Sequence, residues 1–226
     1  MIILGIDSST KTASVGICDG EKVLASFTLN HKRTHSEKLL EMIDMALKIA
    51  QLDIKDIDAL AVTNGPGSFA GLRIGLATVK GLCHALNKPC YTVSTLDALY
   101  ENVSDGSEEV LYAPLMDARR GEVYCAAYLN GKKVIPDSAM PLSEFLEKIK
   151  EFNFDKVIFT GDGVYPNIEI INSFNKKYLI APEHIIFGSG PSVIRAALKY
   201  GKELDYRDVK AEYLRLSQAE RVKGEK

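Results

Sequence analysis

Short apolar runs separated by polar turns open the chain. The segment IILGIDSSTKTASVGICDGEKVLASFTLN predicts three strands joined by two turns, since apolar and β-branched runs bounded by turn residues are typical of strands. The first strand ends at Asp7 and is followed by Ser8-Ser9-Thr10. Asp19-Gly20, between the second and third strands, is a strong hairpin signal. An aspartate that closes a strand before a hydroxyl-rich turn can hold a metal-bound phosphate, but the same residues are also ordinary turn formers.

The stretch from Val62 to Leu86 changes from strand to helix within a few residues. It begins as the end of an apolar strand, breaks at Asn64-Gly65-Pro66-Gly67, and continues as a helical pattern from Ser68 onward. Ser68 offers an N-cap hydroxyl for that helix. Glycines at a strand-to-helix turn let the backbone come close either to a phosphate or to a second chain.

Two rows of small residues run along this helix. Gly71 and Gly75 form one row, and Ala77, Gly81 and Ala85 form the other. Residues four apart share a helix face, and each interior glycine costs about 1 kcal/mol relative to alanine. Packing against the chain's own sheet would explain one row. Two rows therefore predict close neighbours on two sides of the helix.

The helix predicted for residues 36–50 is apolar on more than one side. Leu39 and Ile43 belong to one apolar face, whereas Leu40, Met42 and Met45 belong to another. A helix that is apolar on two sides is buried on two sides, and methionines suit an adaptable contact. One face would pack on a sheet, and the other predicts a partner.

His31 and His35 stand four residues apart near the start of that helix. This spacing could hold a metal ion on one helix face. However, His31 precedes the expected helix cap, and no carboxylate is positioned to complete the site, although Glu37 is nearby. The pattern favours polar residues at the rim of an interface.

Composition narrows the classes of function. The chain has 226 residues and a formal net charge of −2, with a pI of about 6.1. These values predict no basic footprint for direct binding of nucleic acid. Four cysteines show no CxxC pair and no metal spacing, which predicts reduced thiols in a cytoplasmic protein. We expect no signal peptide and no membrane span.

The second half of the chain repeats the plan of the first. VLYAPLMDARRGEVYCAAYLNGKKVI predicts a strand that ends at Asp117, a second strand, an Asn130-Gly131 hairpin turn and a third strand. A helix capped by Ser143 follows, and KVIFTGDGV then predicts a strand that enters a glycine turn. Such duplication is a specific signal of fold.

The repeat predicts an α/β fold with two mixed-sheet subdomains and flanking helices. The expected halves are residues 1–101 and 110–226, joined by the polar segment 102–109. The second half is reduced, because its later helices are short or interrupted by proline.

These motifs together resemble one protein family almost from end to end. The motifs are Asp7-Ser8-Ser9-Thr10, His35-Ser36-Glu37, the run from Asn64 to Gly75, Asp117-Ala118-Arg119, Gly121-Glu122-Val123-Tyr124 and Tyr213-Leu214-Arg215. The chain is similar to the TsaB family, also called YeaZ. The run GPGSFAGLRIG is highly specific for this family and its relatives, although Ala70 stands where the family often has threonine.

The resemblance implies a duplicated actin/Hsp70/sugar-kinase-like (ASKHA) fold. It also implies a role in forming N6-threonylcarbamoyladenosine in tRNAs that read codons beginning with A. The implied partners are a TsaD-like catalytic paralogue and a TsaE-like ATPase, with ATP or ADP and metal on those subunits and tRNA reached only through the complex.

The resemblance further indicates which paralogue this is. The catalytic relative has an Asn-His-Leu-Glu-Gly-His run whose two histidines bind metal, and the matching residues here are Ser94 to Leu99. Thr95 and Leu99 replace the histidines, and neither side chain can act as an imidazole ligand. We therefore expect a non-catalytic scaffold or activator with no intrinsic metal or cofactor.

Two other classes of function stay open at this point. An actin-fold ATPase or small-molecule kinase would use its own nucleotide site, for which Asp7, Ser9 and Thr10 are the candidates, together with Asp117 and Gly161-Asp162-Gly163. A peptidase would need a metal or a nucleophile–base pair, and the sequence suggests neither.

For a scaffold, the two apolar helices predict the interface. Paired with the like helices of a second copy, or of the paralogue, they would form a four-helix bundle, so that the homodimer and the heterodimer exclude each other. The expected interface residues are His35, Leu39, Leu40, Met42, Ile43, Gly71, Arg73, Gly75, Thr78 and Leu82.

Overall fold

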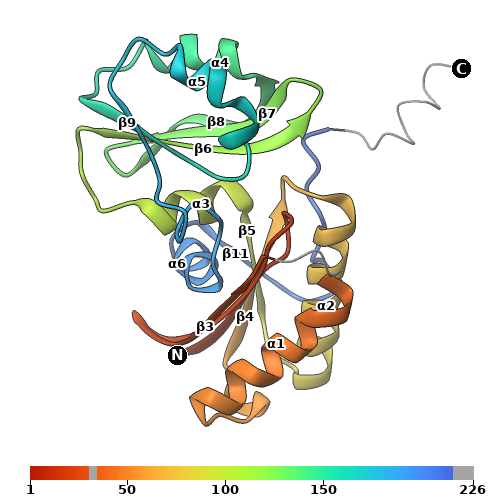
Figure 1. Cartoon of the computed structure of the whole chain (residues 1–226). Coiled ribbons are helices and arrows are strands. Elements are labelled where there is room, and N and C mark those ends of the chain that lie inside the picture. The colour runs from red at the N-terminus through yellow and green to blue at the C-terminus, as the bar shows by residue number, and fades with distance from the viewer. Residues whose placement is uncertain (31–34, 216–226) are drawn as a thin grey trace, which may run out of the picture.

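The computed structural model describes residues 1–30 and 35–215 and contains two mixed β-sheets (Figure 1). The first sheet has the strand order β11-β5-β4-β1-β2-β3, and the second has the order β10-β9-β6-β7-β8. The strands of the first sheet are β1 (Ile2–Asp7), β2 (Ala13–Asp19), β3 (Lys22–Leu29), β4 (Ala59–Gly65), β5 (Cys90–Ser94) and β11 (Lys202–Leu204). Those of the second are β6 (Val110–Arg119), β7 (Glu122–Leu129), β8 (Lys132–Pro141), β9 (Lys156–Thr160) and β10 (Tyr178–Ile180).

The two sheets share one plan, as the sequence repeat predicted. In the first, β1, β2 and β3 form an antiparallel meander, and β4 pairs in parallel with β1. In the second, β6, β7 and β8 form the same meander, and β9 pairs in parallel with β6. The predicted duplication of mixed sheets is confirmed.

Helices cover both faces of the first sheet. Helices α1 (His35–Ala50) and α2 (Phe69–Leu86) contact each other on one face, where they lie side by side in Figure 1. Helices α3 (Thr95–Val103) and α6 (Gly190–Tyr200) lie on the other face, between the two sheets. The buried carboxylate of Glu101 on α3 accepts hydrogen bonds from Lys199 Nζ at 2.9 and 3.0 Å and from the Tyr200 hydroxyl at 2.9 Å.

Helices α4 (Leu142–Ile149) and α5 (Ile168–Asn172) belong to the second sheet. Two short 3₁₀ helices lie before β4 (Ile54–Asp56) and before α5 (Tyr165–Asn167). The predicted cap of α4 is wrong. Strand β8 continues to Pro141, which is itself the N-cap residue and makes no side-chain capping bond. Ser143 therefore falls inside the first turn of the helix.

The end of the chain returns to the first half. Helix α6 packs on the first sheet, where Val193, Ala196 and Ala197 share a core cluster with Ile3, and β11 pairs antiparallel with β5. The expected division into 1–101 and 110–226 is thus corrected, because the second half ends before α6. No helix among the described residues is long and apolar enough to span a membrane.

Candidate functional site

One row of small residues on α2 faces the inside of the protein. The Ser8 hydroxyl donates a hydrogen bond to the carbonyl oxygen of Gly71 at 2.9 Å. A Cβ atom added to Gly75 would lie 2.3 Å from the Ser8 Oγ atom. The expectation that Gly75 lies on a partner-facing strip is therefore wrong, because the protein's own first turn occupies that space.

The other row is open to solvent. Ala77, Gly81 and Ala85 are exposed, and a Cβ atom added to Gly81 would meet no atom within 4 Å. Arg73 is exposed one turn before Ala77. This row can admit a close neighbour without any movement of the protein's own side chains.

The exposed side of α1 carries three large apolar side chains beside the charged residues Glu41, Asp44 and Lys48. Leu40, Met45 and Ile49 are 60%, 50% and 62% exposed. Leu39 and Ile43, on the opposite face, are buried in the core. The helix thus carries large apolar side chains on two sides, as predicted, and the structure covers only one of them.

Nine of the ten residues expected at the interface divide into three groups. Leu39, Ile43, Gly71 and Gly75 are buried within the chain, Leu40 and Arg73 are exposed, and Met42, Thr78 and Leu82 are half-buried. The side chain of His35 and the whole of His31 lie outside the described residues. The sequence predicted neighbours on two sides of α2 but put the row of Gly71 and Gly75 at the interface, whereas the row that faces outward is that of Ala77, Gly81 and Ala85. We call the outer faces of α1 and α2 together the helix-pair surface.

The turn that follows β1 is buried and does not open to solvent. Asp7, Ser9 and Thr10 are all buried. One carboxylate oxygen of Asp7 accepts hydrogen bonds from the Ser9 backbone N–H at 3.0 Å and the Thr63 hydroxyl at 2.8 Å. A Cβ atom on Gly188 would lie 2.4 Å from the other oxygen, so the backbone of Gly188 covers that side.

A leucine fills the space between the two halves next to this turn. Cδ1 of Leu99 lies 3.2 Å from the Cβ position of Gly161, and its Cδ2 lies 4.0 Å from that of Gly188. Leu99 is 1% exposed and Thr95 is fully buried, and the Thr95 hydroxyl has no hydrogen-bond partner among the described residues. Both positions that match the metal-binding histidines of the catalytic relative are occupied by packed side chains.

Another aspartate, Asp162, acts on the charge environment of the Asp7 turn. Asp162 follows β9 and accepts a hydrogen bond from the Asp117 backbone N–H at 3.2 Å. Burial raises the pKa of Asp162 to about 6; the charges of Asp117 and Asp7 act in the same direction, and the Asp117 N–H and Lys11 oppose them. The carboxyl group therefore binds and releases a proton at mildly acidic pH.

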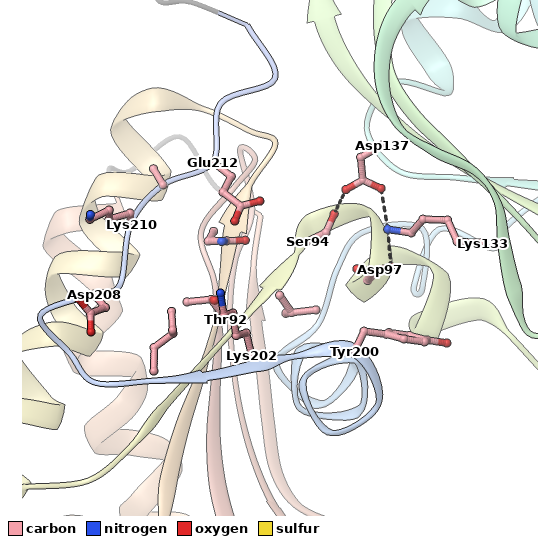
Figure 2. A pocket seen from close by; sticks show the side chains of 14 residues that line it. Thr92, Ser94, Asp97, Lys133, Asp137, Tyr200, Lys202, Asp208, Lys210 and Glu212 are labelled. Carbon is pink, nitrogen blue, oxygen red and sulfur yellow. Dashed lines mark hydrogen bonds and ion pairs between the residues drawn. The ribbon is translucent and has the colours of Figure 1, made fainter.

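A separate cavity of about 810 Å³ opens beside the ends of β4 and β5 (Figure 2). Its lining comes from both halves and from the C-terminal segment, residues 205–215. The lining residues are Asn64, Thr92, Val93, Ser94, Asp97, Lys133, Asp137, Tyr200, Lys202, Leu204, Asp208, Lys210, Ala211 and Glu212. Sequence reasoning missed this cavity, because segments so far apart along the chain carry no shared local signal.

The C-terminal segment ties the two halves together. The ring of Tyr213 stacks on that of Phe69, with centroids 4.2 Å apart and planes at 10°. Arg215 donates to the carbonyl oxygen of Ala118 at 3.2 Å and forms an ion pair with Glu122. These contacts join the end of the described chain to the start of α2 in the first half and to the β6–β7 turn in the second.

Comparisons with known proteins agree with this architecture. The model of the family described as TsaD, tRNA N6-adenosine threonylcarbamoyltransferase, matches residues 22–180. The tRNA threonylcarbamoyladenosine biosynthesis protein TsaB of Bacillus subtilis is 31% identical over 229 residues, which cover 97% of this chain and 96% of that protein. The chain belongs to the TsaB family.

Solved structures confirm the predicted fold of this TsaB-family chain. A Pseudomonas aeruginosa protein described as similar to peptidase YEAZ superposes with a TM-score of 0.76 at 23% identity, covering 95% of this chain and 99% of that one. An inorganic polyphosphate/ATP-glucomannokinase from Arthrobacter superposes with a TM-score of 0.50 at 16% identity, covering 88% and 99%. The duplicated actin/Hsp70/sugar-kinase-like fold is therefore present.

Proposed function

We propose that this chain is a non-catalytic subunit for the formation of N6-threonylcarbamoyladenosine in tRNAs that read codons beginning with A. It would dock a TsaD-like catalytic paralogue on the helix-pair surface and work with a TsaE-like ATPase. The observation that carries the proposal is the exposed apolar side chains of α1 together with the open small-residue row of α2.

The chemistry of the helix-pair surface suits a helical partner. Met45 and Ile49 lie one turn apart on α1 and are each at least half exposed, and large apolar side chains exposed together can mark a protein–protein contact. The methyl group of Ala77 and the absence of a side chain at Gly81 let a second helix approach closely. A second copy of the chain and the paralogue would compete for this surface, so homodimer and heterodimer would exclude each other.

The packing around Leu99 supports a non-catalytic role. A metal bound at the positions of Thr95 and Leu99 would need imidazole or carboxylate ligands, whereas Leu99 fills the space between Gly161 and Gly188. The buried turn at Asp7 argues in the same direction against an intrinsic nucleotide site. ATP, ADP and metal would then belong to the partner subunits.

Sedimentation of matched variants tests the docking surface. Ile49→Glu places a charge on the apolar face, and Gly81→Leu fills the close-approach row. Each variant should weaken association with a second copy and with the paralogue by about tenfold or more, which corresponds to about 1.4 kcal/mol. The control Leu179→Glu changes a leucine that is 48% exposed on the second sheet and should leave both associations unchanged.

Two results would contradict the proposal. The first is full association by folded Ile49→Glu and Gly81→Leu proteins. The second is threonylcarbamoylation of tRNA by this chain without the paralogue. Tight ATP binding by the isolated chain would instead favour an actin-fold ATPase or kinase.

A further inference from the structure

The cavity of about 810 Å³ lies where open α/β sheets commonly bind ligands. Its floor is formed by the carboxyl ends of the parallel strands β4 and β5, the edge at which such sheets hold small molecules. Its volume falls within the usual range of ligand pockets. The cavity is separate from the helix-pair surface.

Two polar side chains on the floor are buried without a hydrogen-bond partner. Asn64, at the end of β4, is 5% exposed, and Thr92, on β5, is 6% exposed. No hydrogen bond joins the Asn64 amide or the Thr92 hydroxyl to another described residue, and their polar atoms are not among the fully buried ones without a partner, because both side chains line the cavity. Buried polar groups are normally hydrogen-bonded. These two groups, which line the cavity, therefore point to a ligand with hydroxyl or carbonyl groups.

The wall opposite the C-terminal segment is fixed by a charged network (Figure 2). Lys133 Nζ lies 2.8 Å from Asp97 and 2.7 Å from Asp137, and the Ser94 hydroxyl donates to Asp137. Tyr128 donates to Asp97 at 2.7 Å. Because these charges pair with one another across the two halves, they shape the wall without needing a ligand.

The rim of the cavity carries ammonium groups and carboxylates that form no ion pair with a described residue. Within the described residues Lys202 and Lys210 form no ion pair, although both line the cavity and are exposed. The carboxylates of Asp208 and Glu212 line the cavity as well, and in Figure 2 the Lys210 side chain points away from Glu212. The Glu212 backbone N–H donates to the Asn64 carbonyl oxygen at 2.7 Å. Two ammonium groups suit an anionic group, and a carboxylate accepts hydrogen bonds from hydroxyls.

We infer that this cavity binds a small sugar phosphate. The phosphate would lie at Lys202 and Lys210, and the sugar hydroxyls would bond to Asn64, Thr92 and Glu212. A nucleobase fits less well, because bases are commonly held by stacking on aromatic rings. The single aromatic side chain of the lining, Tyr200, is engaged through its hydroxyl with Glu101.

Calorimetric titration of the full-length chain with ribose 5-phosphate tests the assignment. Ribose alone and inorganic phosphate alone should each bind at least about tenfold more weakly than ribose 5-phosphate, because each lacks half of the contacts. The double variant Lys202→Met/Lys210→Met should weaken ribose 5-phosphate binding about tenfold or more. Thr92→Val keeps the shape of the side chain and should weaken binding through loss of the hydroxyl alone.

Two control variants locate the binding. Lys177→Met removes an exposed lysine far from the cavity lining and should change nothing. Lys11→Met removes the lysine beside Asp162 and should also change nothing. The inference is overturned if ribose 5-phosphate does not bind, if phosphate alone binds equally well, or if Lys11→Met weakens binding while the double variant does not.

Discussion

The two glycines Gly75 and Gly81 on α2 should respond in opposite ways to the same substitution. Gly81→Ala adds a methyl group where no atom lies within 4 Å. Since alanine is favoured over glycine in a helix interior, Gly81→Ala should raise the free energy of unfolding by about 1 kcal/mol. The same gain applies to Gly75→Ala, but there the new Cβ would lie 2.3 Å from Ser8 Oγ.

The cost at Gly75 can be divided into its parts. The Ser8 side chain must move, which costs about 1–3 kcal/mol for overpacking in a well-packed core. Its hydrogen bond to the Gly71 carbonyl oxygen at 2.9 Å is then lost, at about 1 kcal/mol. After the gain in helix propensity is subtracted, Gly75→Ala should lower the free energy of unfolding by about 1–3 kcal/mol.

The Ser8→Ala background separates the clash from other effects. Without Ser8 Oγ, the nearest atoms to the new methyl group are Ser8 Cβ at 3.6 Å and a Val62 methyl at 3.7 Å, which are ordinary contacts. Gly75→Ala should therefore be neutral or stabilising when combined with Ser8→Ala. The measurement is urea denaturation of the four proteins, followed by far-UV circular dichroism. Additive effects of Ser8→Ala and Gly75→Ala would refute this reasoning, because residues in contact should couple.

Two further predictions concern buried polar groups between the halves. The pKa of Asp162 is about 6 in the folded protein and about 4 in an unfolded chain. Between these pH values the folded state binds more protons than the unfolded state. The free energy of unfolding therefore falls as the pH rises from about 4 to 6. Asp162→Asn should therefore raise the free energy of unfolding by up to about 3 kcal/mol at pH 8 and by little at pH 4. An equal effect at both pH values in denaturation experiments would contradict the raised pKa of Asp162. Thr95→Val keeps the shape of a fully buried side chain and removes a hydroxyl that lacks a partner among the described residues, so the thermal midpoint should rise, by the equivalent of about 1–2 kcal/mol. A lower midpoint would show that the Thr95 hydroxyl is satisfied in solution.

Local patterns in the sequence predicted the repeated part of the fold well. The meanders β1–β3 and β6–β8 follow from alternating apolar runs with hairpin signals at Asp19-Gly20 and Asn130-Gly131. Ser68 caps α2 as expected, since its hydroxyl accepts a hydrogen bond from the Gly71 backbone N–H at 3.4 Å. Each of these features is decided by residues close together in the chain, which is why the sequence alone reveals them.

The candidate site was predicted only in part. The apolar second face of α1 was visible from its periodicity, because side chains three and four apart share a face wherever the helix lies. The two rows on α2 could not be assigned in the same way. Both consist of small residues, and small residues permit close approach equally to the chain's own Ser8 and to a partner.

The sequence by itself determined which segments become strands and helices, which faces of them are apolar, and which family the chain resembles. Only the tertiary structure decided which neighbour covers each face. It placed Ser8 against Gly75, left Gly81 open, returned β11 to the edge of the first sheet, and brought Thr92 and Lys133 to one cavity. The physical reason is that the spacing of apolar residues shows which face of an element is removed from water. Which element covers that face depends on the path of the whole chain.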